Sequence, residues 1–206
     1  MTETNHCWHC GNPAAESLFC KFCNSLQRPT PDYYQFFGLP RRLSLDPDDL
    51  QKRFYSLSRQ LHPDLFSRAT PTDRQYSLEA TAILNDAYRV LRDPVARAEY
   101  VLKEQGLEVS QQKPKDVPPE LLEELFELNM LIEELRSGDS SVGPQLEAAH
   151  RKFVTLRQEA DAELERLFQQ YDRTADPKLF TDIRSLLIRR RYIENLIQQV
   201  EKELAP

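Results

Sequence analysis

All four cysteines of this 206-residue chain lie in its first 23 residues, as two Cys-x2-Cys pairs separated by nine residues. Each short turn directs two thiolates to one point, and four thiolates complete the closed tetrahedral shell of a structural zinc site. Gly11, directly after the second cysteine, allows the first turn to adopt a positive φ. The spacing therefore predicts one structural Zn²⁺, in a segment that needs the metal to fold. The expected ligands are Cys7, Cys10, Cys20 and Cys23.

Other chemistry for the four thiols stays open at the level of sequence. Two disulfides would suit a secreted protein, although no signal peptide precedes the motif and the other 183 residues hold no cysteine. A redox Cys-x-x-Cys pair normally opens a helix in a βαβ unit, which the sequence does not indicate. The same shell could bind iron instead of zinc, and His6 or His9 could replace one thiolate.

A second candidate site is the tripeptide His62-Pro63-Asp64, which lies between two amphipathic helical patterns. The proline fixes φ at this turn, while Asp64 offers a charged acceptor and His62 a donor beside it. Taken alone, the tripeptide is also compatible with a plain helix-terminating turn. A catalytic role for His62 is not expected, because the sequence places no nucleophile or second base near it.

The elements that position this turn are expected to be helices. Asp46 suits an N-cap and Pro47 the first helical position. Pro63 biases His62 out of the helical region, so this first long helix is expected to end near Leu61. Its apolar stripe within residues 48–61 consists of Leu50, Phe54, Leu57 and Leu61.

Helical periodicity continues towards the C-terminus, and no strand pattern appears. Further helices are expected at residues 72–91, between Pro94 and Gly106, and at 119–136, 144–171 and 177–203. Short connections between the last three predict an antiparallel three-helix bundle. The expected fold class is therefore all-α. Its expected parts are a zinc knuckle (1–28), a helical domain (32–105), a linker (106–118) and the bundle (119–204).

Composition argues against several classes of function. The net charge of −6 disfavours binding along a phosphate backbone. No run of about 18 apolar residues is present, so no membrane-spanning helix is expected. With only 5 glycines, the chain shows no phosphate-cradling or dinucleotide-binding loop and no nucleophile-elbow motif. We therefore expect a protein that is not an enzyme, with neither a nucleic-acid nor a membrane partner.

The residues around the tripeptide resemble those of a J-domain. The matching motifs are Asp32-Tyr33-Tyr34 before Phe37-Gly38-Leu39, the run Asn85-Asp86-Ala87-Tyr88-Arg89-Val90-Leu91, and Asp93-Pro94 with Arg97-Ala98-Glu99-Tyr100. The resemblance implies that residues 32–105 dock on a heat-shock-70-type chaperone, similar to DnaK or HscA, and stimulate its ATPase. By the same resemblance, His62, Pro63 and Asp64 are essential for this step.

A basic face on the helix before the tripeptide fits such docking. Residues 41–74 carry seven Lys or Arg against five acids, a local charge of +2 in an acidic chain. Lys52 and Arg59 lie opposite the apolar stripe and Arg53 lies at its flank. These three residues are expected to contact an acidic chaperone surface. A solvated helix face is the alternative for each of them.

Two helices of the expected bundle carry more apolar residues than one core face needs. On 119–136, Leu122, Phe126 and Met130 form a row away from the core stripe of Leu121, Leu125, Leu128, Ile132 and Leu135. On 177–203, a similar off-core row consists of Ile188, Tyr192 and Leu196. Acidic residues surround the first row, and the last helix holds a cluster of Arg184, Arg189, Arg190 and Arg191. Exposed apolar rows rimmed by charge indicate a protein-binding face, unless they pack inside the molecule.

The order of the parts resembles the HscB family of iron–sulfur cluster co-chaperones, in particular its animal, mitochondrial branch with an N-terminal tetracysteine knuckle. The resemblance implies that the bundle binds an iron–sulfur scaffold protein and delivers it to the chaperone for cluster transfer. The implied scaffold-binding residues are Leu122, Phe126 and Tyr192. Met130 is a candidate that departs from the family pattern, in which an acidic residue is usual.

Three questions stay open at this stage. The alternative function is a general J-domain co-chaperone, or holdase, for unfolded clients. The resemblance favours the mitochondrial matrix, but the zinc motif starts too early to leave room for a transit peptide, so the cytosol is the alternative. The sequence does not determine the oligomeric state, and a weak homodimer is one option.

Overall fold

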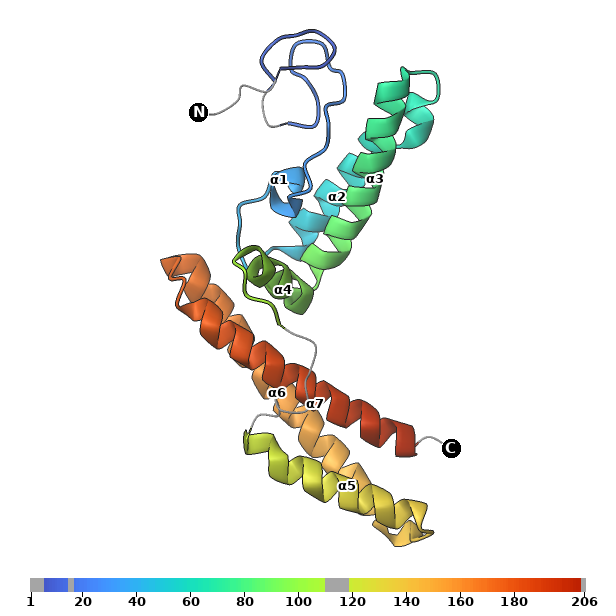
Figure 1. Ribbon diagram of the computed structural model, residues 1–206, viewed down its shortest axis with the longest axis vertical. Helices are drawn as coiled ribbons and strands as arrows, with labels where there is room; N and C mark the ends of the chain where they lie inside the picture. The colour runs from blue at the N-terminus through green and yellow to red at the C-terminus, as the bar shows by residue number, and fades with distance from the viewer. Residues whose placement is uncertain (1–5, 15–16, 110–118, 205–206) are drawn as a thin grey trace. The chain divides into compact units, whose positions relative to one another are not determined.

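The structure is a computed structural model that describes residues 6–14, 17–109 and 119–204. Across these ranges the chain is helical and forms no strand; two isolated bridges, His6 to Pro13 and Phe19 to Leu26, occur near the N-terminus. Figure 1 labels the helices α1 to α7. The predicted all-α fold is confirmed. The chain divides into two compact units, residues 1–97 and 98–206.

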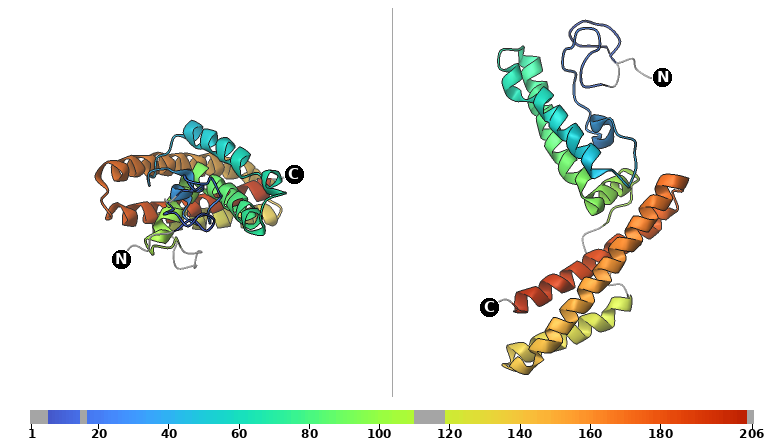
Figure 2. Two further views of the ribbon diagram at one scale, coloured as in Figure 1. Left: turned by 90° about the horizontal axis from the view of Figure 1, so that it is seen from above. Right: turned by 180° about the vertical axis from the view of Figure 1, so that it is seen from behind.

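The first unit contains the N-terminal loops and a helical hairpin. Its elements are α1 (Tyr33–Phe37), α2 (Pro47–Leu61), the 3₁₀ turn η1 (Pro63–Phe66) and α3 (Pro71–Arg92). Helices α2 and α3 run antiparallel side by side, as Figures 1 and 2 show. The buried residues of the two helices are Leu50, Leu61, Ser77, Ala80, Leu84, Ala87 and Leu91.

Helix α2 begins and ends where the sequence predicts. The Asp46 side chain accepts hydrogen bonds from the amides of Asp48 and Asp49, and the proline at the first helical position has the φ that a helix needs. At the other end His62 has φ −56° and ψ 127°, because the proline after it excludes the helical conformation. The predicted boundaries of this helix are therefore confirmed.

Helix α4 (Pro94–Glu104) crosses the division between the units and ends as expected. Gly106 follows it with φ +73°, and the amide of Leu107 donates to the carbonyl of Leu102 over 2.9 Å. This left-handed cap satisfies the last carbonyls of the helix. The linker expected at 106–118 is described only as far as residue 109, and the rest of it lies outside the described residues.

The second unit contains three long helices in antiparallel succession. They are α5 (Leu122–Arg136), preceded by the 3₁₀ turn η3 (Pro119–Leu121), α6 (Gly143–Thr174), preceded by η4 (Ser140–Val142), and α7 (Leu179–Leu204). Helices α6 and α7 pack along their length, and α5 packs against both. The buried core of the second unit includes Leu121, Leu128, Ile132, Leu146, Phe153, Ile193, Ile197 and Val200. The predicted three-helix bundle is confirmed.

The structure corrects the predicted off-core row of the last helix. Leu196 is only 3% exposed and belongs to the core between α5, α6 and α7. Tyr192 is partly buried and packs against the same core, and Ile188 is also half-buried. Helix α7 has neighbours on two sides, so it needs apolar residues over a wider arc than a helix with a single buried stripe. The α7 row is therefore mostly interior.

Three arginines of the α7 cluster have hydrogen-bond or ion-pair partners within the second unit. Arg184 donates to the carbonyl of Glu108 over 2.9 Å, and Arg191 to the carbonyl of Val109 over 3.2 Å. Arg190 pairs with Asp161 of α6. Three of the four arginines that cluster in the sequence of this helix therefore have partners within the second unit.

Candidate functional sites

The four cysteines lie together, as predicted. All four Sγ atoms lie within 4.8 Å of one another. The Cys7 and Cys23 sulfurs are 3.6 Å apart, and those of Cys10 and Cys20 are 3.8 Å apart. A tetrahedral zinc with bonds of about 2.3 Å requires sulfur–sulfur edges of roughly 3.8 Å. The four thiols are free in the structure, and their arrangement fits a closed metal shell without an open coordination position.

Two equivalent backbone turns place these sulfurs. In the first, the amide of Gly11 donates to the carbonyl of Cys7 over 2.9 Å; in the second, Asn24 donates to Cys20 over 2.8 Å. Gly11 has φ +70° and Asn24 has φ +59°. Asparagine tolerates this left-handed conformation better than most residues. The knuckle is thus a repeat of two turns offset by thirteen residues, with only the first turn signalled by a glycine.

Polar neighbours of Cys7 and Cys23 suit the thiolate form of these two sulfurs. The buried Gln27 side chain donates to Cys7 Sγ over 3.4 Å and to the carbonyl of Ser25 over 2.8 Å. Hydrogen bonds with the hydroxyl and the amide of Ser25 lower the pKa of Cys23 to about 5. Such outer contacts orient metal ligands and favour their charged state. The donor set therefore fits a structural divalent metal, and Cys7, Cys10, Cys20 and Cys23 would hold it.

The His-Pro-Asp turn lies where the α2–α3 hairpin changes direction. The amide of Asp64 donates to Nδ1 of His62 over 3.3 Å, and the Asp64 carboxylate lies 3.6 Å from the same atom. A neutral ring that accepts at Nδ1 carries its proton at Nε2. The side chains of His62 and Asp64 are 58% and 91% exposed. The turn therefore presents an imidazole donor and a carboxylate acceptor to the surface.

The three basic residues expected near this turn are placed differently from one another. Lys52 and Arg59 are exposed on one face of α2, whereas Arg53 is half-buried. Arg53 bonds to Asp49 and to the carbonyls of Phe37 and Gly38, at 2.8, 3.2 and 3.1 Å. Its guanidinium thus ties the end of α1 to α2. Two of the three cations are available to a partner in the described geometry.

Sequence reasoning missed two exposed apolar residues beside these groups. Tyr55 lies between Lys52 and Arg59 on the same face of α2 and is 55% exposed. Leu65 directly follows the tripeptide and is 65% exposed. The signal for Tyr55 was an aromatic residue outside the apolar stripe of its helix. The signal for Leu65 was the presence of a large apolar residue in a turn.

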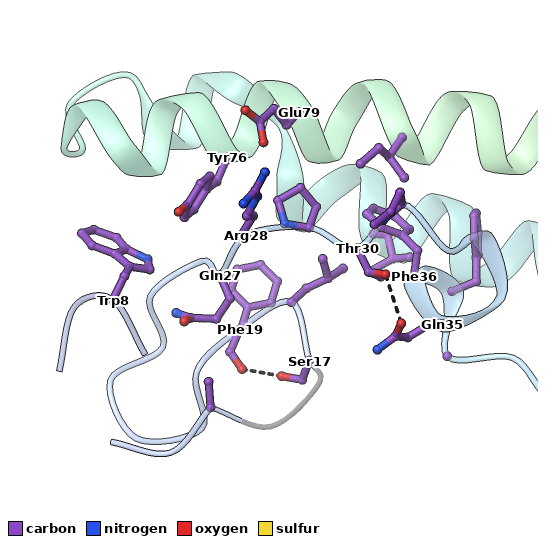
Figure 3. A pocket seen from close by; sticks show the side chains of 18 of the residues that line it. Trp8, Ser17, Phe19, Gln27, Arg28, Thr30, Gln35, Phe36, Tyr76 and Glu79 are labelled. Carbon is purple, nitrogen blue, oxygen red and sulfur yellow. Dashed lines mark hydrogen bonds between the residues drawn. The ribbon is translucent and has the colours of Figure 1, made fainter. Parts of the chain in front are cut away.

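A contact between the knuckle and α3 was also missed. Trp8 donates its indole N–H to the carbonyl of Leu26 over 2.7 Å and meets the Tyr76 ring edge to face at 6.2 Å. Beside these rings lies an open cleft of about 1000 Å³, shown in Figure 3, across which Arg28 and Glu79 point toward one another. Residues 1–97 accordingly form one compact unit. A separate knuckle domain ending at residue 28 stays a prediction.

The apolar row on α5 is exposed, as predicted. Leu122, Phe126 and Met130 are 52%, 66% and 48% exposed, at successive turns of one helix. The opposite side of α5 supplies Leu128 and Ile132 to the core. An exposed row of this kind on an otherwise well-packed helix is typical of a binding surface.

The fourth residue expected at this surface, Tyr192, is only partly accessible. Asn129 pairs with Gln199, and Arg136 with Glu203, so α5 and α7 run parallel. This register places Tyr192 on the part of α7 that lies beside the start of α5. The structure therefore brings Tyr192 to the end of the row near Leu122, but as a residue that also packs on the core.

Comparison with known proteins identifies the family to which the chain belongs. The DnaJ domain model matches residues 32–100, and the model of the HSCB C-terminal oligomerisation domain matches residues 117–201. The mouse iron–sulfur cluster co-chaperone protein HscB is 29% identical, over 97% of this chain and 83% of its own length. The homolog from Arabidopsis thaliana is 30% identical, over 96% of this chain and 74% of its own length. A co-chaperone HscB homolog from Vibrio cholerae is 33% identical, over 84% of this chain and 98% of its own length.

Solved structures agree with this result. The crystal structure of human co-chaperone protein HscB matches with a TM-score of 0.70 and 27% identity, over 97% of this chain and 98% of that one. Chaperone HscB from Vibrio cholerae matches with a TM-score of 0.60 and 29% identity, over 83% of this chain and 96% of that one. The His-Pro-Asp hairpin and the DnaJ match define a J-domain co-chaperone. With the C-terminal domain and the full-length relatives, the chain belongs to the HscB family of iron–sulfur cluster co-chaperones. The predicted family is thereby confirmed.

Proposed function

We propose that this protein binds an iron–sulfur scaffold protein through its C-terminal bundle and delivers it to a heat-shock-70-type chaperone for cluster transfer. The chaperone would be engaged by the His-Pro-Asp turn, which stimulates its ATPase. The observation that carries this proposal is the placement of two different exposed surfaces on the two units. One is a polar turn on the α2–α3 hairpin, and the other is an apolar row on α5.

The chaperone-binding surface is proposed to be His62, Pro63 and Asp64 with Lys52 and Arg59. The exposed imidazole and carboxylate can each form a charge-assisted or neutral hydrogen bond with a partner. The cations on α2 would steer this encounter toward an acidic surface. Arg53 is proposed to act mainly by holding α1 against α2, since its donors already bind Asp49 and two carbonyls.

The scaffold-binding surface is proposed to be Leu122, Phe126 and Met130, with Tyr192 at its edge. Burying exposed apolar side chains provides most of the free energy at such an interface. Acidic residues next to the row, such as Glu123 and Glu127, would favour a partner with basic residues around an apolar patch.

We further propose that the knuckle binds one structural Zn²⁺, and that the protein acts in the mitochondrial matrix without enzymatic activity of its own. Four thiolates with no open position favour zinc over a catalytic metal. In the described part of the chain, no helix is both long and apolar enough to cross a bilayer. The proposed parts are the knuckle (1–28), the J-domain (32–105), the linker (106–118) and the bundle (119–204).

The test of the delivery function uses purified chaperone and purified scaffold protein. We expect a defined complex with the scaffold, and we expect the scaffold and this protein together to raise chaperone ATPase more than either does alone. An aggregation assay with an unrelated unfolded client is the matched control. Broad suppression of aggregation without a defined scaffold complex would instead favour the general holdase.

A further inference from the structure

The His-Pro-Asp turn leaves one buried carbonyl without a local donor. Leu61 ends α2 and is 0% exposed. Pro63 has no amide hydrogen, the amide of Asp64 binds Nδ1 of His62, and the amide of Leu65 binds the carbonyl of His62. The turn therefore directs none of these amides at the Leu61 carbonyl. A buried carbonyl without a donor is costly, so another part of the chain must supply one.

Two hydroxyl groups of α3 supply these donors. Ser77 Oγ donates to the Leu61 carbonyl over 2.8 Å, and Thr81 Oγ1 donates to the same oxygen over 3.2 Å. The two residues are one helical turn apart, and a carbonyl oxygen can accept both bonds with its two lone pairs. Ser77 is 0% exposed among the apolar residues of the hairpin. A serine inside a helix usually bonds to its own preceding turn, whereas this one reaches across to another helix.

We propose that Ser77 and Thr81 are positioning residues for the His-Pro-Asp turn. The Leu61 carbonyl belongs to the planar peptide group that leads into His62, so fixing this oxygen fixes the direction in which His62 leaves α2. The bond from the Asp64 amide to Nδ1 of His62 fixes the ring relative to the turn, whereas the bonds to the Leu61 carbonyl fix the turn relative to α3. The inference rests on the proposed function, in which this turn engages the chaperone.

The test compares hydroxyl-deleting and hydroxyl-keeping variants of the full chain. Thr81→Val removes the donor but keeps the shape, and Thr81→Ser keeps the donor; Ser77→Ala removes the buried donor. Stimulation of chaperone ATPase is measured against co-chaperone concentration, below the unfolding temperature of every variant. Hydrogen exchange of the Asp64 and Leu65 amides reports the turn itself.

For Ser77→Ala with Thr81→Val, we expect the co-chaperone concentration for half-maximal stimulation to rise about fivefold, because both hydroxyl donors to the Leu61 carbonyl are lost. We expect faster exchange of the Leu65 amide and unchanged scaffold affinity. Thr81→Ser should match the wild type. If the double variant does not fold, Ser77→Ala alone should raise that concentration about twofold.

Full stimulation by the folded variants at wild-type concentration would overturn the inference, even if their melting temperature fell. This result differs from a failure of the proposed function. In that case the wild type and His62→Gln would give equal ATPase rates, and the turn would have no role for Ser77 and Thr81 to support.

Discussion

The His-Pro-Asp turn and the apolar row of α5 are both exposed, but they are held in different ways. The turn depends on hydrogen bonds that fix each group, from the Asp64 amide to the hydroxyls that bind the Leu61 carbonyl. The row depends on helix geometry alone, since its side chains project from a helix whose other face is packed in the core.

This difference has consequences for binding. A surface that works through a few directed polar groups loses function when one group changes, because the partner's matching group is left unpaired. A surface that works through buried apolar area loses affinity in steps, with each side chain contributing a share. The two surfaces should therefore respond to mutation differently and independently of each other.

The largest expected effect is that of His62→Gln on the turn. Glutamine keeps a polar side chain but cannot offer the ring geometry that pairs with the Asp64 amide. We expect chaperone ATPase stimulation to be lost and scaffold affinity to be unchanged, as measured by steady-state ATPase assay and calorimetry. Stimulation at the wild-type level would remove the role assigned to the turn.

The next largest effect is expected for the row. Leu122→Ala with Phe126→Ala should weaken scaffold binding by at least about thirtyfold, as for loss of one anchor worth roughly 2 kcal/mol. Because both residues are exposed, the melting temperature should hardly change. The matched control is Leu128→Ala on the core face of α5, which should cost about 2–5 kcal/mol of unfolding free energy. Early melting of the double variant together with normal binding would show that the row is structural.

How far the sequence can predict such surfaces differs between α5 and α7. On α5, helical periodicity correctly separated the exposed row from the buried stripe. On α7, the same periodicity was misleading, because Leu196 and Tyr192 pack on the core. A periodic pattern shows where apolar residues lie on one helix, but not how many neighbours that helix has.

The same limit applies to polar residues. The tetracysteine spacing and the tripeptide were recognisable because their chemistry is local in sequence. Ser77 and Thr81 were not, because their acceptor lies 16 and 20 residues away. The partners of the α7 arginines were not recognisable for the same reason, since the carbonyls that bind Arg184 and Arg191 are 76 and 82 residues distant.

A smaller effect is expected for the charges on α2. Lys52→Glu or Arg59→Glu should reduce chaperone stimulation a few-fold, and the reduction should shrink as salt is raised, because both residues are exposed and their interactions are screened. Lys202→Glu on α7 makes the same charge change in the other unit and is the control. A loss equal to that of the control would exclude a docking role for this face.

The smallest effect on either partner is expected from the knuckle. Cys20→Ser should abolish binding of the one metal ion, as measured by elemental analysis, because three thiolates leave the shell open. We expect the helical signal to persist, since α2 and α3 have their own buried residues. Chaperone stimulation and scaffold affinity should change by less than about twofold, because Cys20 belongs to neither of the two proposed binding surfaces. Absence of zinc from the wild type would contradict the metal assignment itself.

The hydroxyl bonds to the Leu61 carbonyl also affect how the loop after η1 can vary. The junction of Ala69 and Thr70, in the loop that follows η1, contributes neither of these bonds. The entropy of closing a loop rises only slowly with its length. Insertions at this point should therefore leave the His-Pro-Asp turn in place, so that the loop is free to differ in length while the orientation of His62 stays constant.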